Sequence, residues 1–389
     1  MGWRSPHRLR RVKGTCMTAV NEASNGNYWA GQLKKALLNP IQAFRWQYLP
    51  LLMVYFAYGA LGLVAVAESF WIKKNLTLTP TELASLSVWL TLPWTIKMVF
   101  GELVDAVPIL GSQRRIYVLI GGAFIAAGLL MLAGAAGGWL TFASPENIYR
   151  LGSFLNIVGV VLQDVTADAM STEVVARTNA DGTPRPKEEV NRDLGMVQVL
   201  GRLALSFGMF SVAGISGWIA SIYSYETVFL MGLLIPVISV TGAMLVKLDK
   251  VESRPVDWRI LGGGIVFGAV VVALGMLDVP YNQEIVFAVS MAVVIAMLVR
   301  VVGDLDEATK RKIFYAAIII FVYRAAPSVG SGYTWFTIDV LGFDEAFQGT
   351  LNQIGTALAL IGTWLFSDAI TRRPVAKVLL WLTIVTTLL

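Results

Sequence analysis

The chain is poor in the residues from which catalytic sites and covalent cross-links are usually built. Its 389 residues include one cysteine, Cys16, and one histidine, His7, which excludes a disulfide framework and a zinc site made of Cys and His ligands. The same counts exclude a Ser-His-Asp or Cys-His active site unless it uses His7. The sequence also lacks a G-x-x-x-x-G-K-[ST] phosphate loop, which argues against transport driven by its own ATP hydrolysis. We expect no bound metal ion or cofactor.

Charged residues are also scarce. They make up 15% of the sequence, whereas soluble domains carry about 25%. Hydrophobic residues make up 56%, and the mean hydropathy is +0.65. This balance is typical of a membrane protein with several spans and not of a soluble enzyme. The net charge of +5 is not clustered on a soluble face, so we expect no nucleic-acid partner.

Long apolar runs dominate what the sequence does contain. A helix that crosses a bilayer needs about 20 predominantly apolar residues, and the runs are of this length without a two-residue alternation. They predict an all-α polytopic membrane protein with about 11 transmembrane helices. The predicted spans are 48–71, 84–103, 115–137, 148–175, 194–217, 226–246, 260–279, 285–301, 312–338, 346–367 and 375–389.

Lysine and arginine indicate the orientation of these spans. If the N-terminus is cytoplasmic, 25 of the 31 basic residues fall in inner segments, against three in outer ones (Lys73, Lys74 and Arg150). The N-terminal tail, residues 1–47, has no apolar run long enough for a signal peptide. We therefore expect a multi-pass protein with a basic cytoplasmic tail. A bacterial inner membrane is the expected location, and a plastid envelope is the alternative because the tail loosely resembles a transit peptide.

Two segments late in the chain repeat two early ones. The turn at residues 75–83 has a weak counterpart at 340–347, and the run from Gly101 to Arg115 is echoed between Phe366 and Arg373. The ninth and tenth spans therefore correspond to the first and second. We expect an N-terminal six-helix half, an inserted pair of helices with inner loops, and the start of a C-terminal half with three helices (residues 48–247, 248–311 and 312–389). On this register a complete second half would need about three more spans.

Three motifs resemble those of a known transporter family. LPWTIK at residues 92–97, followed by Gly101, Asp105 and VPILG at 107–111, resembles the run LPW-IKP-YG-LSD-FPIFGYRRR of the folate/biopterin transporter family. DVTADAM at residues 164–170 resembles its DVVVDALVVER run. A third stretch matches through Pro327-Ser328, Phe336, Leu341-Gly342-Phe343 and Gly349. The family belongs to the major facilitator superfamily, and the resemblance extends from about Glu68 to the C-terminus with the inserted pair unmatched.

The resemblance implies a major-facilitator-type helix bundle and a secondary active transporter. Its expected substrate is a folate or a pterin-like solute, moved by alternating access and coupled to a proton gradient as a symporter. We expect a monomer whose partners are the substrate, the coupling ion and the lipid bilayer. Another small anionic solute is the first alternative, because a fold does not fix a substrate.

Charged residues inside the spans are the candidate binding and coupling residues, because each needs a partner or a wet cavity. Lys97 in the second span is expected to hold an anionic group of the substrate, or else to pair with Asp105 or Glu102. Asp164 and Asp168 are four residues apart and share one helix face. They suit a proton relay or hydrogen bonds from the aminopyrimidine edge of a pterin. The alternative is a structural pair with an arginine of the fifth span.

Two arginines and one glutamate complete this set. Arg202 in the fifth span and Arg324 in the ninth carry planar guanidinium groups that suit a carboxylate such as the glutamate tail of a folate. Salt bridges between helices are the alternative role for both. Glu68 near the outer end of the first span is expected to line the mouth of the pathway more than to couple transport. Trp94 or Trp335 could stack on a flat ring, although membrane-interface or helix contacts are the commoner role of tryptophan.

Four further residues are assigned to gating. Asp105, Arg114 and Arg115 match the inner-loop signature that, by the resemblance, locks helix ends in the outward-facing state. Glu173 follows the fourth-span carboxylates at the cytoplasmic end and joins this set.

An intramembrane enzyme is the alternative of a different class. Asp164 and Asp168 have the D-x-x-x-D spacing of a magnesium-diphosphate motif in membrane prenyltransferases. That chemistry needs a second Asp-rich motif, and the other near-pair, Asp304 and Asp306, lies in a loop beside basic residues. The repeat and the inner-loop signature favour transport, so we predict that the chain is not an enzyme.

Overall fold

The computed structural model contains helices and no β-strand in the residues that it describes. This confirms the all-α prediction. The described residues are 44–76, 78–110, 114–179, 181–246, 248, 255–276, 281–303, 305–324, 330–372 and 375–388. Most of the predicted tail, residues 1–47, lies outside them.

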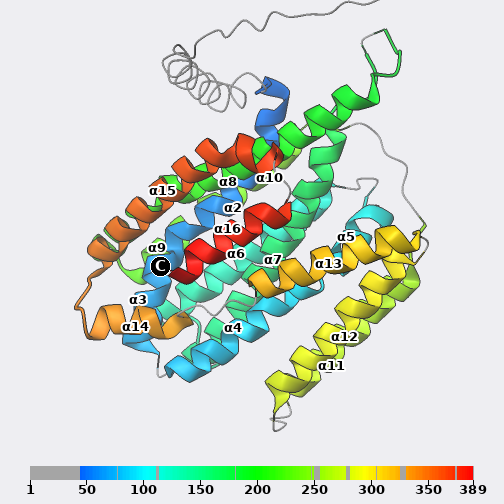
Figure 1. The fold of residues 1–389 in the computed structure, drawn as a ribbon. Coiled ribbons are helices and arrows are strands. Elements are labelled where there is room, and N and C mark those ends of the chain that lie inside the picture. Colours follow the sequence, from blue (N-terminus) through cyan, green and yellow to red (C-terminus); the bar gives the residue numbers. More distant parts are fainter. Residues whose placement is uncertain are drawn as a thin grey trace, which may run out of the picture.

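The first six predicted spans are long helical segments that run in alternating directions (Figure 1). The first consists of η1 (Trp46–Tyr48), α2 (Leu49–Ala60), η2 (Leu61–Val64) and α3 (Ala65–Asn75). The next four consist of α4 (Pro80–Thr95) with α5 (Lys97–Ala106), α6 (Arg115–Gly137), α7 (Pro145–Glu173) and α8 (Lys187–Ile222). The sixth consists of α9 (Tyr225–Met231) and α10 (Leu234–Leu245).

The rest of the chain forms six helices in its described residues. They are α11 (Trp258–Met276), α12 (Asn282–Val302), α13 (Glu307–Arg324), α14 (Gly330–Asp339), α15 (Glu345–Arg372) and α16 (Val375–Leu388). The ninth predicted span, 312–338, is thus covered by two helices and not by one. Gly342, in the turn before α15, has a φ of 67°, a left-handed conformation that glycine adopts without strain.

Among the described residues, five helical segments are long and apolar enough to cross a membrane. They are Trp46–Asn75, Arg115–Gly137, Pro145–Glu173, Lys187–Ile222 and Tyr225–Leu245. All five belong to the predicted N-terminal half. The total of eleven spans stays a prediction, as do the two-half organisation and its repeat.

The second span is broken in the middle, which its hydropathy did not reveal. Thr79 begins α4 with a capping box, in which its hydroxyl accepts from the Glu82 amide and the Glu82 carboxylate accepts from the Thr79 amide. Pro93 lies inside the helix and cannot donate a backbone hydrogen bond, and the chain leaves helical geometry at Ile96. Lys97 therefore starts a new helix inside the span. Interrupted helices of this kind are common at the binding sites of transporters.

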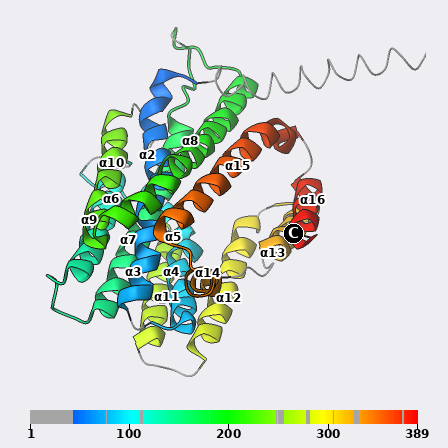
Figure 2. The same ribbon diagram turned by 90° about the vertical axis from the view of Figure 1, so that its left-hand side faces the viewer.

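Aromatic and aliphatic side chains of the first six spans form the core. The buried Trp71 ring lies edge-to-face against Tyr149 and Phe229, with ring centroids 5.9 and 5.8 Å apart. Helix pairs α6–α7 and α2–α8 make the largest contacts of this part. The inserted pair, α11 and α12, stands at the edge of the bundle beside α5 and α4, and α15 runs along α8 (Figure 2).

The crossing of α8 and α15 leaves no room for a side chain where Gly217 meets Gly349. A Cβ atom on Gly349 would lie 2.6 Å from the Gly217 Cα atom, so Gly349→Leu is expected to separate the helices and lower the free energy of unfolding by about 1–3 kcal/mol. Gly355→Leu is the matched control on the same helix, because a Cβ atom there meets nothing within 4 Å. Titration with a denaturing detergent measures both changes. Equal stability of the two variants would contradict the close approach of α8 and α15 at Gly349.

Candidate functional site

Lys97 joins two carboxylates of the fourth span. Its ammonium group lies 2.5 Å from the Asp164 Oδ2 atom and 3.0 Å from the Asp168 Oδ2 atom. The break at Ile96 places Lys97 at the start of α5, and the four-residue spacing places both aspartates on one face of α7. Lys97 and the pair of aspartates were predicted separately as site residues, and the structure brings them together. The alternative partners, Asp105 or Glu102 for Lys97 and Arg202 for the aspartates, are wrong.

The two aspartates differ in their surroundings. The side chain of Asp164 is only 3% exposed, and its Oδ1 atom has no hydrogen-bond donor among the described residues. The Asp168 side chain is 32% exposed, and its Oδ1 atom accepts a hydrogen bond from the buried Tyr55 hydroxyl at 3.0 Å. Sequence reasoning missed Tyr55, because a tyrosine in an apolar span resembles any other core residue. Asp164 thus retains an acceptor for a ligand, while Asp168 is held in place.

Flat rings lie next to this charged cluster. The Lys97 ammonium is 5.9 Å from the centre of the Trp94 ring, within the range of a cation–π interaction. Trp94 in turn stacks on Tyr58 of α2, with ring centroids 6.1 Å apart and an interplanar angle of 24°. The site therefore combines charge with aromatic surface, which suits a flat polar solute.

Arg202 provides a positive charge beside the cluster. In the described part of the chain no carboxylate lies within 4.0 Å of it, and its side chain is exposed. Its charge acts on Asp164 and Tyr58. The neighbouring Gly201 packs against the Tyr55 ring. An arginine without an ion pair next to a polar site is available to an anion. The side chain of Arg324, at the end of α13, lies outside the described residues.

Arg114 forms a second ionic cluster at the end of the bundle where α6 begins, here called the Arg114 end. Its guanidinium group donates to Glu173 at 2.8 and 2.6 Å and to the Val104 carbonyl at 2.7 Å, and pairs with Asp105 at 2.7 Å. The side chains of Arg114 and Glu173 are 8% and 6% exposed. Three of the four predicted gating residues therefore meet. Arg115 does not join them, and it donates instead to the Val246 carbonyl at 2.8 Å.

At the opposite end of the bundle, here called the Lys74 end, α3 contacts the later helices. Lys73 pairs with Asp339 of α14 at 2.8 Å and lies over the Trp335 ring. Lys74 pairs with Glu345 of α15 at 2.6 Å. Sequence reasoning counted both lysines as outer charges and missed these contacts. The partners lie more than 260 residues away in the sequence, which left no local signal.

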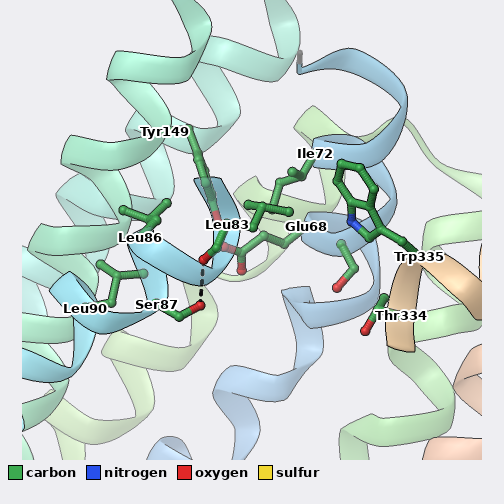
Figure 3. Close-up of a pocket in the computed structure, with 10 residues that line it drawn as sticks. Glu68, Ile72, Leu83, Leu86, Ser87, Leu90, Tyr149, Thr334 and Trp335 are labelled. Atoms are coloured by element: carbon green, nitrogen blue, oxygen red, sulfur yellow. Dashed lines mark hydrogen bonds between the residues drawn. The ribbon is translucent and has the colours of Figure 1, made fainter. Parts of the chain in front are cut away.

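Glu68 lines a cavity of about 180 Å³ near the Lys74 end (Figure 3). The Tyr149 hydroxyl of α7 lies beside its carboxylate. Thr334 and Trp335 of α14 form part of the same wall. Glu68 therefore lies in a site of its own, separate from the Lys97 cluster.

The sequence profile of the BT1 family matches residues 59–389. The chain belongs to the BT1 family. It is 26% identical over 344 residues to the folate-biopterin transporter of Synechocystis sp., a match that covers 88% of this chain and 58% of the relative. It is also 26% identical over 230 residues to the probable folate-biopterin transporter 4 of Arabidopsis thaliana, covering 59% and 42%. The family predicted from the motifs is confirmed. The BT1 chain spans less than two-thirds of the length of these relatives.

Solved structures with a similar fold come from the POT family of transporters. A POT family transporter in complex with a thioalcohol-conjugated peptide matches with a TM-score of 0.57 and 16% identity, over 85% of this chain and 72% of that one. Another, in complex with 5-aminolevulinic acid, matches with a TM-score of 0.51 and 14% identity, over 84% and 70%. These matches concern the fold of the BT1 chain, and they confirm the predicted major-facilitator-type bundle.

Proposed function

We propose that the chain is a secondary active transporter of folate- or pterin-like solutes that works by alternating access. The observation that carries this proposal is the Lys97 cluster, in which opposite charges and flat rings meet at a broken helix. The names of its BT1 relatives support it, because they are folate-biopterin transporters and not enzymes. Asp164 and Asp168 are both occupied by Lys97, which disfavours the magnesium-diphosphate chemistry of a prenyltransferase.

The residues of the cluster match the chemistry of a pterin. Its aminopyrimidine edge donates hydrogen bonds, and the free Oδ1 atom of Asp164 is an acceptor. The ring system is flat, and Trp94 and Tyr58 offer aromatic surface beside Lys97. The glutamate tail of a folate carries carboxylates, and Arg202 is a cation without a partner among the described residues. Another flat anionic solute would use the same groups.

The membrane setting is part of the proposal. The excess of basic residues at the Arg114 end makes this the cytoplasmic end, with the N-terminus on the same side. A monomer in a bacterial inner membrane is the proposed form, with a plastid envelope as the alternative. Ion pairs of Lys73 and Lys74 with α14 and α15 would close the outer end, and the Arg114 cluster would hold helix ends together at the inner one. A proton gradient would drive accumulation.

Uptake of labelled folate and biopterin into cells that express the chain tests the proposal. Wild type is expected to accumulate one of them above empty-vector cells. Asp168→Asn is expected to lose this uptake, because asparagine carries no charge for Lys97 and has one acceptor oxygen where Asp168 uses two, for Tyr55 and for Lys97. Asp181→Asn, in an exposed loop, is the matched control and should transport normally. If wild-type protein that is inserted in the membrane takes up neither solute, folate and biopterin are rejected as substrates. Other anionic solutes then become the candidates.

A further inference from the structure

Glu68 has no positive partner among the described residues, unlike the carboxylates of the Lys97 and Arg114 clusters. Asp164 and Asp168 share Lys97, and Asp105 and Glu173 share Arg114. Within the described residues no lysine or arginine lies within 4.0 Å of Glu68. A carboxylate without a counter-charge is costly inside a protein or a membrane unless it is neutralised. No described side chain packed against Glu68 offsets its charge, so its presence in α3 suggests a functional role.

The cavity around Glu68 is built from both early and late helices. Most of its wall is apolar, from Ile72, Leu83, Leu86 and Leu90, with the Ser69 and Ser87 hydroxyls at its edge. The two serines already donate to carbonyls of their own helices, at 3.0 and 2.8 Å. Thr334 and Trp335 of α14 close the opposite side (Figure 3). Movement of α14 away from α3 would widen the access of water to this cavity.

The charged groups around the cavity are paired elsewhere. On α3 itself, Lys73 and Lys74 bind Asp339 of α14 and Glu345 of α15. On α4, Glu82 caps its own helix through Thr79, and on α7 the Arg150 guanidinium lies 3.4 Å from the Asn147 side chain. In the described part of the chain, Tyr149 is the titratable side chain that acts on Glu68. The carboxylate is thus free to respond to a small cation.

We propose that Glu68 takes up and releases the coupling proton, a step that rests on the proposed function. A proton neutralises the lone carboxylate without the several oxygen ligands that a metal ion would need. Thr334 and Trp335 of α14 form one wall of the cavity, and separation of α14 from α3 would widen its access to the outer solution, so proton exchange follows the opening of the Lys74 end. Lys97, Asp164 and Asp168 then bind the substrate and not the coupling proton. Substrate and proton then bind at separate sites of one bundle, and both respond to the same movement.

Transport by the full chain in proteoliposomes tests this assignment. Glu68→Gln is expected to abolish accumulation driven by a pH gradient, while exchange of labelled for unlabelled pterin stays within about twofold of wild type, because exchange needs no net proton movement. Glu68→Asp should keep part of the pH-driven accumulation. Glu188→Gln, an exposed carboxylate at the start of α8, is the control. Normal pH-driven accumulation by Glu68→Gln, or accumulation by wild type on a sodium gradient alone, would overturn the proposal.

A second measurement needs no substrate and separates this proposal from the proposed function. Dicyclohexylcarbodiimide reacts with protonated carboxyl groups in apolar surroundings, and mass spectrometry maps the modified residue. Glu68 is expected to be labelled in the wild-type protein, with labelling that falls as the pH rises, and Asp164 is expected to be labelled less because Lys97 pairs with it. Preferential labelling of Asp164 or Asp168 would overturn the assignment. Labelling of Glu68 in a protein that moves no pterin would instead reject the pterin substrate alone.

Discussion

Replacing Lys97 with methionine is expected to lower pterin uptake by about two orders of magnitude, because it removes the shared partner of two carboxylates. Asp164 would be left 3% exposed with no counter-ion, and Asp168 would keep only the Tyr55 hydroxyl among its described contacts. Methionine has nearly the length of lysine, so packing beside Trp94 is preserved. The effect therefore reports on charge. Uptake of labelled pterin, normalised to the amount of inserted protein, measures it.

Lys310→Met is the matched control for this prediction. Lys310 pairs with Glu307 at 2.9 Å, but that carboxylate is 90% exposed, and an exposed pair contributes about 0–1 kcal/mol to stability. Uptake by Lys310→Met should therefore match wild type. A triple variant, Lys97→Met with Asp164→Asn and Asp168→Asn, should be more stable than Lys97→Met alone, because it leaves no unpaired carboxylate in the cluster. It should still not transport. Full uptake by Lys97→Met would remove the cluster from the binding site.

Replacing Arg114 with methionine is expected to have the largest effect on stability. Removing one partner of a buried ion pair destabilises a protein by about 3–5 kcal/mol, because the remaining charge stays buried. Glu173 would lose the two hydrogen bonds that Arg114 donates, and Asp105 and the Val104 carbonyl would each lose one contact. These contacts join the end of α5 to the start of α6 and the end of α7. The free energy of unfolding in mixed detergent micelles measures the loss.

The adjacent residue gives a sharp comparison. Arg115→Met removes one partly buried hydrogen bond to the Val246 carbonyl, so we expect a change below about 1.5 kcal/mol. The double variant Arg114→Met with Glu173→Met should be more stable than Arg114→Met alone, since it leaves no unpaired charge on Glu173. If the two single variants are equally stable, the cluster is not the structural element that the distances indicate.

Periodic and compositional features were readable without a structure. The apolar runs predicted the helices, because a segment of about 20 residues that meets lipid must satisfy its backbone hydrogen bonds internally. Motifs around Trp94, Asp105 and Asp168 were sufficient for the family. The four-residue spacing of Asp164 and Asp168 placed them on one helix face. These features depend on neighbours in the chain, and so they are visible in the sequence.

Breaks within the spans were less readable. Pro93 is a clear signal, but the break occurs three residues later, at Ile96, where the chain leaves helical geometry. The first span changes to a short 3-10 helix at Leu61–Val64, and neither its apolar composition nor its length indicates this. Such breaks are set by the packing of neighbouring helices, which hydropathy does not record.

The sequence by itself determined that the protein lies in a membrane, as well as its helical class, its family and the short set of charged residues proposed as its site. The partners of those residues were decided by tertiary structure alone. Lys97 could have paired with Asp105 or Glu102 close by in the chain, yet it pairs with two aspartates 67 and 71 residues away. Glu68 was left without a cation in the same way. The sequence fixes which charges must be satisfied inside the membrane, but the crossing of helices decides which side chains come within hydrogen-bonding distance, and that is a property of packing and not of local sequence.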